Sequence, residues 1–277
     1  MKARAAPLFA AVLFFPSLLS RRRTFSAVAL ESMSSKSKKP RRHVEVELEE
    51  PEKKSPEPEN WKEVYAAIET MRSKADAPVD VMGCGSLGDP HADPKHFRYQ
   101  TLLSLMLSSQ TRDEITAKAM QALHKHFKGK GGLTVDNVVD TEEDKIRELI
   151  YGVGFYNRKA TYIKKTSAKL QKEYGGDIPP TLEKISALPG IGPKMAYLAM
   201  QEAWKNTVGI GVDIHVHRIS NRLKWVQTKT PEQTRPALEA WLPEELWSKV
   251  NKMLVGFGQQ ICSAKNPKCD QCTVGLC

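Results

Sequence analysis

The stretch Leu188-Pro189-Gly190-Ile191-Gly192-Pro193-Lys194 decides how this chain folds. Its glycines allow a tight bend and let the backbone approach another surface closely. Pro193 suits the first position of a helix, where its missing N–H costs little. The sequence therefore predicts a sharp turn between two helices, 181–188 and 193–204.

The second of these helices begins at the bend, and its first backbone N–H groups face outward. Such a helix end attracts a phosphate because the helix dipole is positive there. With amphipathic helices on both sides, the pattern is that of a helix-hairpin-helix, which reads the DNA backbone. Gly190 and Gly192 are then candidate DNA-binding residues. An ordinary connection between two helices is the alternative.

Lys194 falls in the first turn of the second helix. A positive charge is unfavourable at this end of a helix. The same field, together with partial burial, would favour the neutral and nucleophilic amine. A lysine that binds a phosphate is the alternative, and the residues alone leave the two roles open.

Asp213 follows nineteen residues after Lys194, directly before another helical pattern. We expect it to cap that helix, and its position alone indicates nothing more. His215 and His217 are two residues apart and cannot share a helix face. We therefore expect both to be polar residues of the core or the surface, and not metal ligands.

The rest of the chain from Asn60 onward also has helical patterns. Asn60 and Glu63 have the spacing of a capping box, and an apolar face follows at helical spacing. Further helices are expected at 97–108, 113–126, 141–152, 157–174, 216–223, 238–241 and 246–257. Because no convincing run of alternating strands occurs, the predicted fold is all-α.

Four of the five cysteines lie close together near the C-terminus: Cys262, Cys269, Cys272 and Cys277. Four thiolates in one short loop can enclose a single metal centre. Zinc more often uses two Cys-x2-Cys pairs, so an iron–sulfur cluster is favoured, with two disulfides as a third possibility. Lys265 and Lys268 in this loop are candidate phosphate-binding residues, and lysines without a role are equally compatible. Cys84 is expected to be an ordinary thiol.

The composition is that of a globular protein of one large or two small domains. The chain has 277 residues, of which 40% are apolar and 27% charged. The longest apolar run, 8–19, is shorter than the ~20 residues of a bilayer span, so no membrane is expected. Most of the net charge of +10 lies in residues 1–43, whereas 60–277 hold 30 basic and 24 acidic residues. That milder excess is compatible with a polyanionic partner.

Residues 1–59 are expected to be a disordered targeting tail and linker. Residues 1–30 are rich in arginine and poor in acids, which is typical of a mitochondrial transit peptide, with a secretory signal or no targeting role as the alternatives. Residues 36–42 form a basic cluster of the nuclear-localisation type. Residues 44–59 are rich in Glu and Pro and indicate a disordered linker. The sequence thus predicts both mitochondrion and nucleus.

Three ordered motifs together resemble the bifunctional DNA glycosylases of the endonuclease III family. They are the hairpin at 188–194, the segment 212–218 and the four C-terminal cysteines, and the resemblance covers about residues 60–277. It implies an all-α, helix-hairpin-helix DNA glycosylase fold with a six-helix domain and an iron–sulfur cluster domain. The implied ranges are 1–59 for the tail, 60–94 for an N-terminal helix and loop that pack on the cluster domain, 95–206 for the six-helix domain and 207–277 for the cluster domain.

The resemblance also implies a reaction. Oxidised pyrimidines would be excised from double-stranded DNA through a Schiff base on Lys194, and β-elimination would then cut the strand at the abasic site. Asp213 matches the family's carboxylate. Gln110 matches a residue that fills the gap left by the flipped base, and Phe155 a second apolar wedge, with core packing as the alternative for Phe155.

The cofactor and the oligomeric state also follow from the resemblance. A 4Fe–4S cluster would be held by the four C-terminal cysteines: Cys262, Cys269, Cys272 and Cys277. Four residues separate the last two, one fewer than is usual in the family. A monomer is expected.

Two other functions stay open at this point. An adenine glycosylase of the same superfamily lacks the nucleophilic lysine and usually carries a further C-terminal domain, so Lys194 and an end at Cys277 argue against it. A noncatalytic DNA-binding module would use the hairpin alone. The presence of both Lys194 and Asp213 would then be a coincidence.

Overall fold

The structure is a computed structural model that describes residues 56–275. These residues belong to one compact unit. The predicted targeting segments and Cys277 lie outside the described residues.

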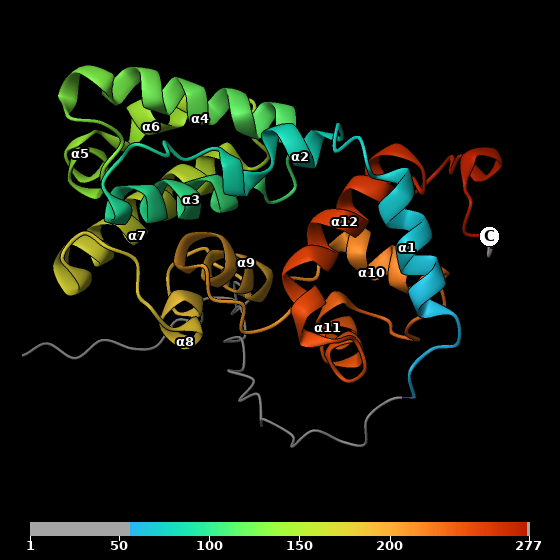
Figure 1. Cartoon of the computed structure of the whole chain (residues 1–277). Coiled ribbons are helices and arrows are strands. Elements are labelled where there is room, and N and C mark those ends of the chain that lie inside the picture. The colour runs from blue at the N-terminus through green and yellow to red at the C-terminus, as the bar shows by residue number, and fades with distance from the viewer. Residues whose placement is uncertain (1–55, 276–277) are drawn as a thin grey trace, which may run out of the picture. The chain divides into compact units, whose positions relative to one another are not determined.

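Every regular element of residues 56–275 is helical, so the prediction of an all-α fold is confirmed (Figure 1). The α-helices are α1 (Trp61–Met71), α2 (Pro78–Met82), α3 (Pro94–Ser108), α4 (Asp113–Phe127), α5 (Val135–Asp140), α6 (Glu143–Leu149), α7 (Tyr156–Tyr174), α8 (Leu182–Ser186), α9 (Pro193–Trp204), α10 (Ile214–Arg222), α11 (Pro231–Glu239) and α12 (Trp247–Gln260). Short 3-10 helices lie at η1 (Cys84–Ser86), η2 (Lys128–Lys130), η3 (Glu244–Leu246) and η4 (Cys269–Gln271). None of the described helices has both the length and the apolar character needed to cross a membrane.

The first of two hydrophobic cores is built around α3. All residues of α3 from Tyr99 to Leu107 are buried, and α3 packs against α4, α7 and α9. Residues from α4 to α9 complete this core. Because residues of α8 and α9 belong to this core, the core anchors the predicted hairpin.

The second core joins the first helix of the described chain to the last ones. Trp61 and Ile68 of α1 are buried together with Leu254 and Phe257 of α12, and α10 and α11 supply further members. Trp61 also meets Trp241 edge to face, with the ring centroids 5.4 Å apart. The helix that comes first in sequence is therefore covered by α10–α12, which come last. The domain boundaries expected at 95 and 207 stay predictions.

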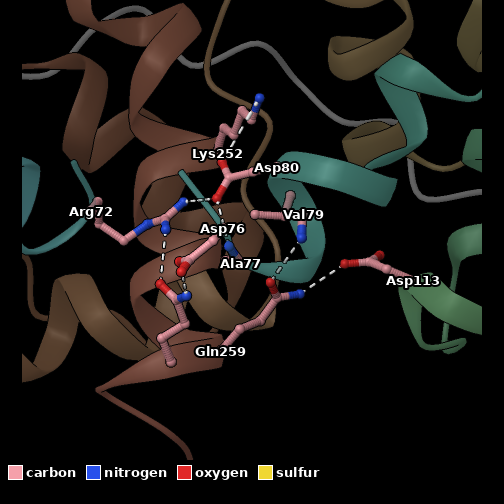
Figure 2. Close-up of polar contacts among 9 residues, drawn as sticks. Arg72, Asp76, Ala77, Val79, Asp80, Asp113, Lys252 and Gln259 are labelled. Carbon is pink, nitrogen blue, oxygen red and sulfur yellow. Dashed lines mark hydrogen bonds and ion pairs between the residues drawn. The ribbon is translucent and has the colours of Figure 1, made fainter. Parts of the chain in front are cut away.

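A polar network links α1 and α2 to α12 and α4 (Figure 2). Arg72 pairs with Asp80, and both side chains are only 7% exposed. The amide of Gln259 on α12 accepts a hydrogen bond from the Val79 N–H at 3.0 Å and donates one to Asp113 Oδ2 at 2.8 Å. Asp113 begins α4, so Gln259 ties a helix of the second core to a helix of the first.

Two predicted helix starts require correction. Asn60 does precede α1, but its backbone is left-handed (φ 58°) and its side chain makes no capping hydrogen bond. Thr141 does not begin α6, because its hydroxyl donates to Asn137 O at 2.7 Å and so closes the end of α5. Helix α6 begins at Glu143 without a side-chain cap.

Helix α11 was expected at 238–241, and that placement is wrong. The helix spans Pro231–Glu239 and runs through Pro236. Thr230 caps it by accepting the Gln233 N–H at 3.3 Å, and Leu238 anchors it in the second core. The sequence patterns also missed α2 and α5, which have only five and six residues.

Candidate active site and DNA interface

The hairpin turn between α8 and α9 is braced from behind by α7. Leu188 is buried in the first core, and Thr166 of α7 donates to Pro189 O at 2.8 Å. Gly190 has φ +79°, and a Cβ there would lie 2.7 Å from Tyr162 Cγ. Both the conformation and the close approach therefore require glycine at this position.

Gly192 marks the opposite, open side of the turn. It precedes α9 in an extended conformation, and no side chain of the described residues caps the helix. A Cβ at Gly192 would meet nothing within 4 Å. Pro193 occupies the first helical position, as predicted, and the next N–H groups have no partner within the helix. This end of α9 is thus free to receive an anion.

The side chains of Lys194 and Asp213 come together at the start of α9 and α10. Lys194 Nζ lies 3.7 Å from Asp213 Oδ2, and the two side chains are 39% and 12% exposed. The other carboxylate oxygen, Oδ1, accepts the N–H groups of His215 at 2.9 Å and Val216 at 2.8 Å. Asp213 therefore caps α10 as predicted and also faces the amine.

Three further groups lie within electrostatic reach of Lys194. Burial raises the pKa of the Cys84 thiol to about 11, and the charge of Lys194 opposes this rise. Burial also raises the pKa of Asp113 and lowers that of His215, and Lys194 acts on both. The sequence analysis did not predict that Cys84 and Asp113 interact with Lys194, because no sequence spacing relates these residues to the hairpin.

Gln110 and Phe155 lie on adjacent loops. Gln110 is exposed between α3 and α4, with φ +51°. Phe155 precedes α7 with φ +57° and is 58% exposed, so the alternative of core packing is wrong. A Cβ on Gly154 would lie only 2.5 Å from Gln110 O, which shows how closely the loops approach. Gln110 and Phe155 are two of the six non-glycine residues with left-handed backbone among residues 56–275, a conformation that is uncommon outside glycine.

The cysteine loop contains three free thiols among the described residues. Cys262 is buried, Cys272 half-buried and Cys269 exposed. Arg222 donates to Cys262 Sγ at 3.3 Å and to Ser263 O at 2.8 Å. The Cys262 sulfur is thus held in place by a side chain of α10. The sulfur donors and this contact fit an iron–sulfur cluster.

The structure does not bring the cysteines together as a finished site. Within residues 56–275, no group of three or more His, Cys, Asp or Glu side chains is arranged to hold a metal ion. The fourth expected ligand, Cys277, is outside the described residues. Lys265 and Lys268 are exposed on the same loop, and the Lys268 N–H donates to Ile261 O at 2.9 Å, which closes the loop at its base.

Comparison with known proteins now defines the class of this protein. The sequence model of the "HhH-GPD superfamily base excision DNA repair protein" matches residues 103–244, which include the hairpin, Lys194 and Asp213. The fold and site are therefore those of a helix-hairpin-helix base excision repair protein.

The relatives narrow this class. The chain is 56% identical to Endonuclease III-like protein 1 of Mus musculus over 218 residues, which are 78% of this chain and 71% of that protein. It is 51% identical to Endonuclease III-like protein 1 of Gallus gallus over 238 residues, 83% of each chain. A solved endonuclease III, trapped as a covalent intermediate with DNA, matches with a TM-score of 0.66 and 25% identity, covering 78% of this chain and 93% of that one. The chain belongs to the endonuclease III family.

Proposed function

We propose that the protein excises oxidised pyrimidines from DNA and then cuts the strand at the resulting abasic site. The observation that carries this proposal is the placement of Lys194 Nζ 3.7 Å from Asp213 Oδ2, at the mouth of a helix-hairpin-helix turn. An amine beside a carboxylate, next to a helix end open to phosphate, provides a nucleophile, a proton acceptor and a DNA anchor in one place.

The reaction assigns a step to each side chain. A damaged base must first leave the DNA stack to be reached. The neutral amine of Lys194 attacks C1′ of the sugar, a C1′–N bond forms, and the bond to the base breaks. Asp213 Oδ2 faces the amine, where it can take up a proton and stabilise positive charge on the sugar.

The second half of the reaction uses the same lysine. The C1′–O4′ bond of the sugar then breaks, O4′ takes up a proton, and the nitrogen of Lys194 forms a Schiff base with C1′. The Schiff base acidifies the proton at C2′. Removal of that proton breaks the C3′–O bond, and the phosphate leaves on the 3′ side. Hydrolysis of the imine then releases Lys194.

The exposed loops suit the DNA side of the reaction. We assign Gln110 to the gap left by the flipped base and Phe155 to a second wedge, because both are exposed on adjacent loops. The Gln110 loop leads into α4, whose first residue, Asp113, interacts electrostatically with Lys194. Gly190 and Gly192 let the hairpin approach the phosphates, and Lys265 and Lys268 extend that contact from the cysteine loop.

The two alternative functions account less well for this geometry. A noncatalytic DNA-binding module has no use for an amine and a carboxylate facing each other beside the hairpin. An adenine-type glycosylase lacks the lysine nucleophile. The spatial pairing of Lys194 with Asp213 favours the bifunctional enzyme over both.

Borohydride trapping on DNA that contains thymine glycol tests the proposal. The wild-type protein should be trapped covalently on the DNA, and Lys194→Gln should abolish trapping while binding to damaged DNA persists. Lys184→Gln, which removes an exposed charge from α8 of the same hairpin, is the control and should be trapped normally. Trapping of Lys194→Gln would place the nucleophile elsewhere.

We also propose that Cys262, Cys269, Cys272 and Cys277 hold a 4Fe–4S cluster, which the endonuclease III family is known to bind. When bound, the cluster supplies a structural and electron-transfer centre. In this chain Arg222 would position the Cys262 sulfur, and the closed base of the loop would hold the ligands in place.

Metal analysis tests the cluster. Purified protein should be yellow-brown and contain about four iron atoms per chain, as four-thiolate ligation implies. Cys262→Ser should lose iron, and Cys84→Ser, which is remote from the loop in sequence, should change neither iron content nor colour. Stoichiometric zinc without iron would contradict the proposal.

The subcellular location and the oligomeric state are proposals that rest on the sequence alone. We assign the protein to mitochondrion and nucleus, based on residues 1–30 and 36–42. A fluorescent fusion of the whole chain, with and without the Arg21–Arg23 triplet, separates the two destinations. A monomer is expected to act on double-stranded DNA.

A further inference from the structure

Lys159 on α7 is a buried lysine whose ammonium donates three hydrogen bonds. The residue is 8% exposed. Its Nζ donates to Leu107 O at 2.7 Å, to Ser109 O at 2.6 Å and to Thr111 Oγ1 at 3.2 Å. An ammonium has three donors, and all three are directed at the last turn of α3 and the segment that follows it. Lys159 therefore holds the Gln110 loop, residues 108–112.

Thr111 also contacts the Phe155 loop, residues 152–155, and so connects that loop to Lys159. Its hydroxyl donates to Ser109 O at 3.2 Å and accepts both the Lys159 ammonium and, at 3.0 Å, the Gly154 N–H. A hydroxyl has one donor and two acceptor sites, so Thr111 is fully satisfied. One ammonium and one hydroxyl thus join both loops.

The burial of the Lys159 ammonium is energetically unfavourable. Burial lowers the pKa of Lys159 to about 8, which shows that the surroundings disfavour the charge. No carboxylate of the described residues forms an ion pair with Lys159, and two carbonyl oxygens and the Thr111 hydroxyl solvate its ammonium. The buried side chains that follow on this face of α7, Ile163 and Leu170 among them, are mostly apolar. A methionine would fill the same space without the cost of desolvation.

We propose that Lys159 is a positioning residue that fixes the Gln110 loop against the Phe155 loop, so that both side chains enter the DNA together. This inference rests on the proposed function, because it needs both loops to contact DNA. Both loops have left-handed backbone at the inserted residue, at Gln110 and at Phe155. The Lys159–Thr111 contacts bind the neighbouring backbone groups, Ser109 O before Gln110 and the Gly154 N–H before Phe155.

Lys159→Met tests the proposal, because it keeps the shape of the side chain and removes the donors. Lys164→Met is the matched control. Lys164 lies on the same helix and also donates to backbone carbonyls, those of Val138 at 3.1 Å and Val139 at 2.6 Å, but at the end of α5. Hydrogen exchange should accelerate in both the Gln110 and Phe155 loops of Lys159→Met. In Lys164→Met it should accelerate near residues 138–141 instead.

Lys159→Met should also affect the two activities, base excision and β-elimination, to different extents. Single-turnover excision of thymine glycol from duplex DNA by Lys159→Met should fall about 10- to 100-fold, as expected for misplaced substrate-positioning groups. β-Elimination at a preformed abasic site in single-stranded DNA should stay at the wild-type rate, because no base is flipped and no gap has to be filled. A merely structural role would lower both rates together. Lys164→Met should resemble the wild type in both assays.

Thr111 provides a second pair of variants if Lys159→Met does not fold. Thr111→Val loses the hydroxyl and should reproduce the selective loss on duplex DNA, and Thr111→Ser should restore it. Normal duplex excision by Thr111→Val, or equal loss on both substrates, would overturn the proposal. If the wild-type protein excises nothing, the proposed function fails. Unchanged hydrogen exchange in the two loops of a folded Lys159→Met would instead overturn the positioning role alone.

Discussion

The starts of α9 and α10 form a contrasting pair, although they face each other. At α10, Asp213 accepts two backbone N–H groups at 2.8 and 2.9 Å. At α9, Gly192 offers no side chain, no described side chain caps the helix, and a Cβ would find open space. One helix start is capped by a side chain of the protein, and the other is left for an external partner.

The difference shows how one fold separates anchoring from chemistry. An open helix start can hold a DNA phosphate, because its N–H groups are still available. A capped start can instead hold a carboxylate rigidly, so that the second oxygen of Asp213 faces Lys194. Variants that change the capped start of α10 should therefore affect the chemistry, and variants that change the open start of α9 should affect DNA binding.

Asp213→Asn gives the largest expected effect. Asparagine caps a helix about as well as aspartate, so the thermal stability should stay near normal. Because the amide cannot take up a proton, base excision should slow by at least about 100-fold, the low end of what a positioned acid–base group contributes. Single-turnover excision of thymine glycol and a thermal melt measure the two properties.

Strand cleavage is the internal control for Asp213→Asn. At a preformed abasic site no base has to be displaced, so cleavage there should suffer less than excision. If Asp213→Asn excises thymine glycol at the normal rate, the carboxylate is only a cap, and α9 and α10 differ in capping alone.

Gly192→Asp converts the open helix start into a capped one. The extended backbone of Gly192 suits a capping residue, so the change should stabilise the protein by about 0.3 kcal/mol. The new carboxylate would compete for the α9 N–H groups and repel phosphate. Affinity for duplex DNA should fall about 10-fold, equivalent to ~1.4 kcal/mol, in an equilibrium binding assay.

Gly192→Asn separates capping from charge. It caps α9 without adding a negative charge, so its loss of DNA affinity should be smaller than that of Gly192→Asp. Wild-type affinity in both variants would mean that α9 does not bind a phosphate.

Thr181→Ala should give the smallest effect. Thr181 caps α8, the other helix of the hairpin, by accepting the Lys184 N–H at 3.4 Å. Because this contact is long, its loss should cost only about 0.5 kcal/mol, measured by denaturant unfolding. Excision should not change, since α8 provides no group to the chemistry, and a marked loss of excision would show that α8 also shapes the site.

The hairpin and the Asp213 cap could be predicted from sequence because local rules fix them. Glycine conformation, proline at a helix start and side-chain capping all act within a few residues. The same local rules failed for α11, which was expected only at 238–241 although it begins at Pro231 and contains Pro236. Burial of Leu238 in the second core and the Thr230 cap stabilise a helix that continues through the proline.

The surroundings of Lys194 could not be predicted, because they depend on tertiary packing. Cys84 and Asp113 reach the lysine from segments about a hundred residues away in the sequence. Lys159 did leave a signal. It lies in phase with the buried positions of α7, such as Ile163 and Leu170, where a lysine is out of place unless its ammonium has partners.

The packing of α1 against α10–α12 has a consequence for how the protein is made. During synthesis α1 leaves the ribosome before the other described helices, and the helices that cover Trp61 and Ile68 are the last of these to emerge. The α3–α9 core is complete in sequence well before then, and domains generally fold as units while synthesis continues. The apolar face of α1 therefore stays uncovered until α10–α12 have been synthesised, which makes the nascent chain a client for chaperones that bind exposed hydrophobic segments.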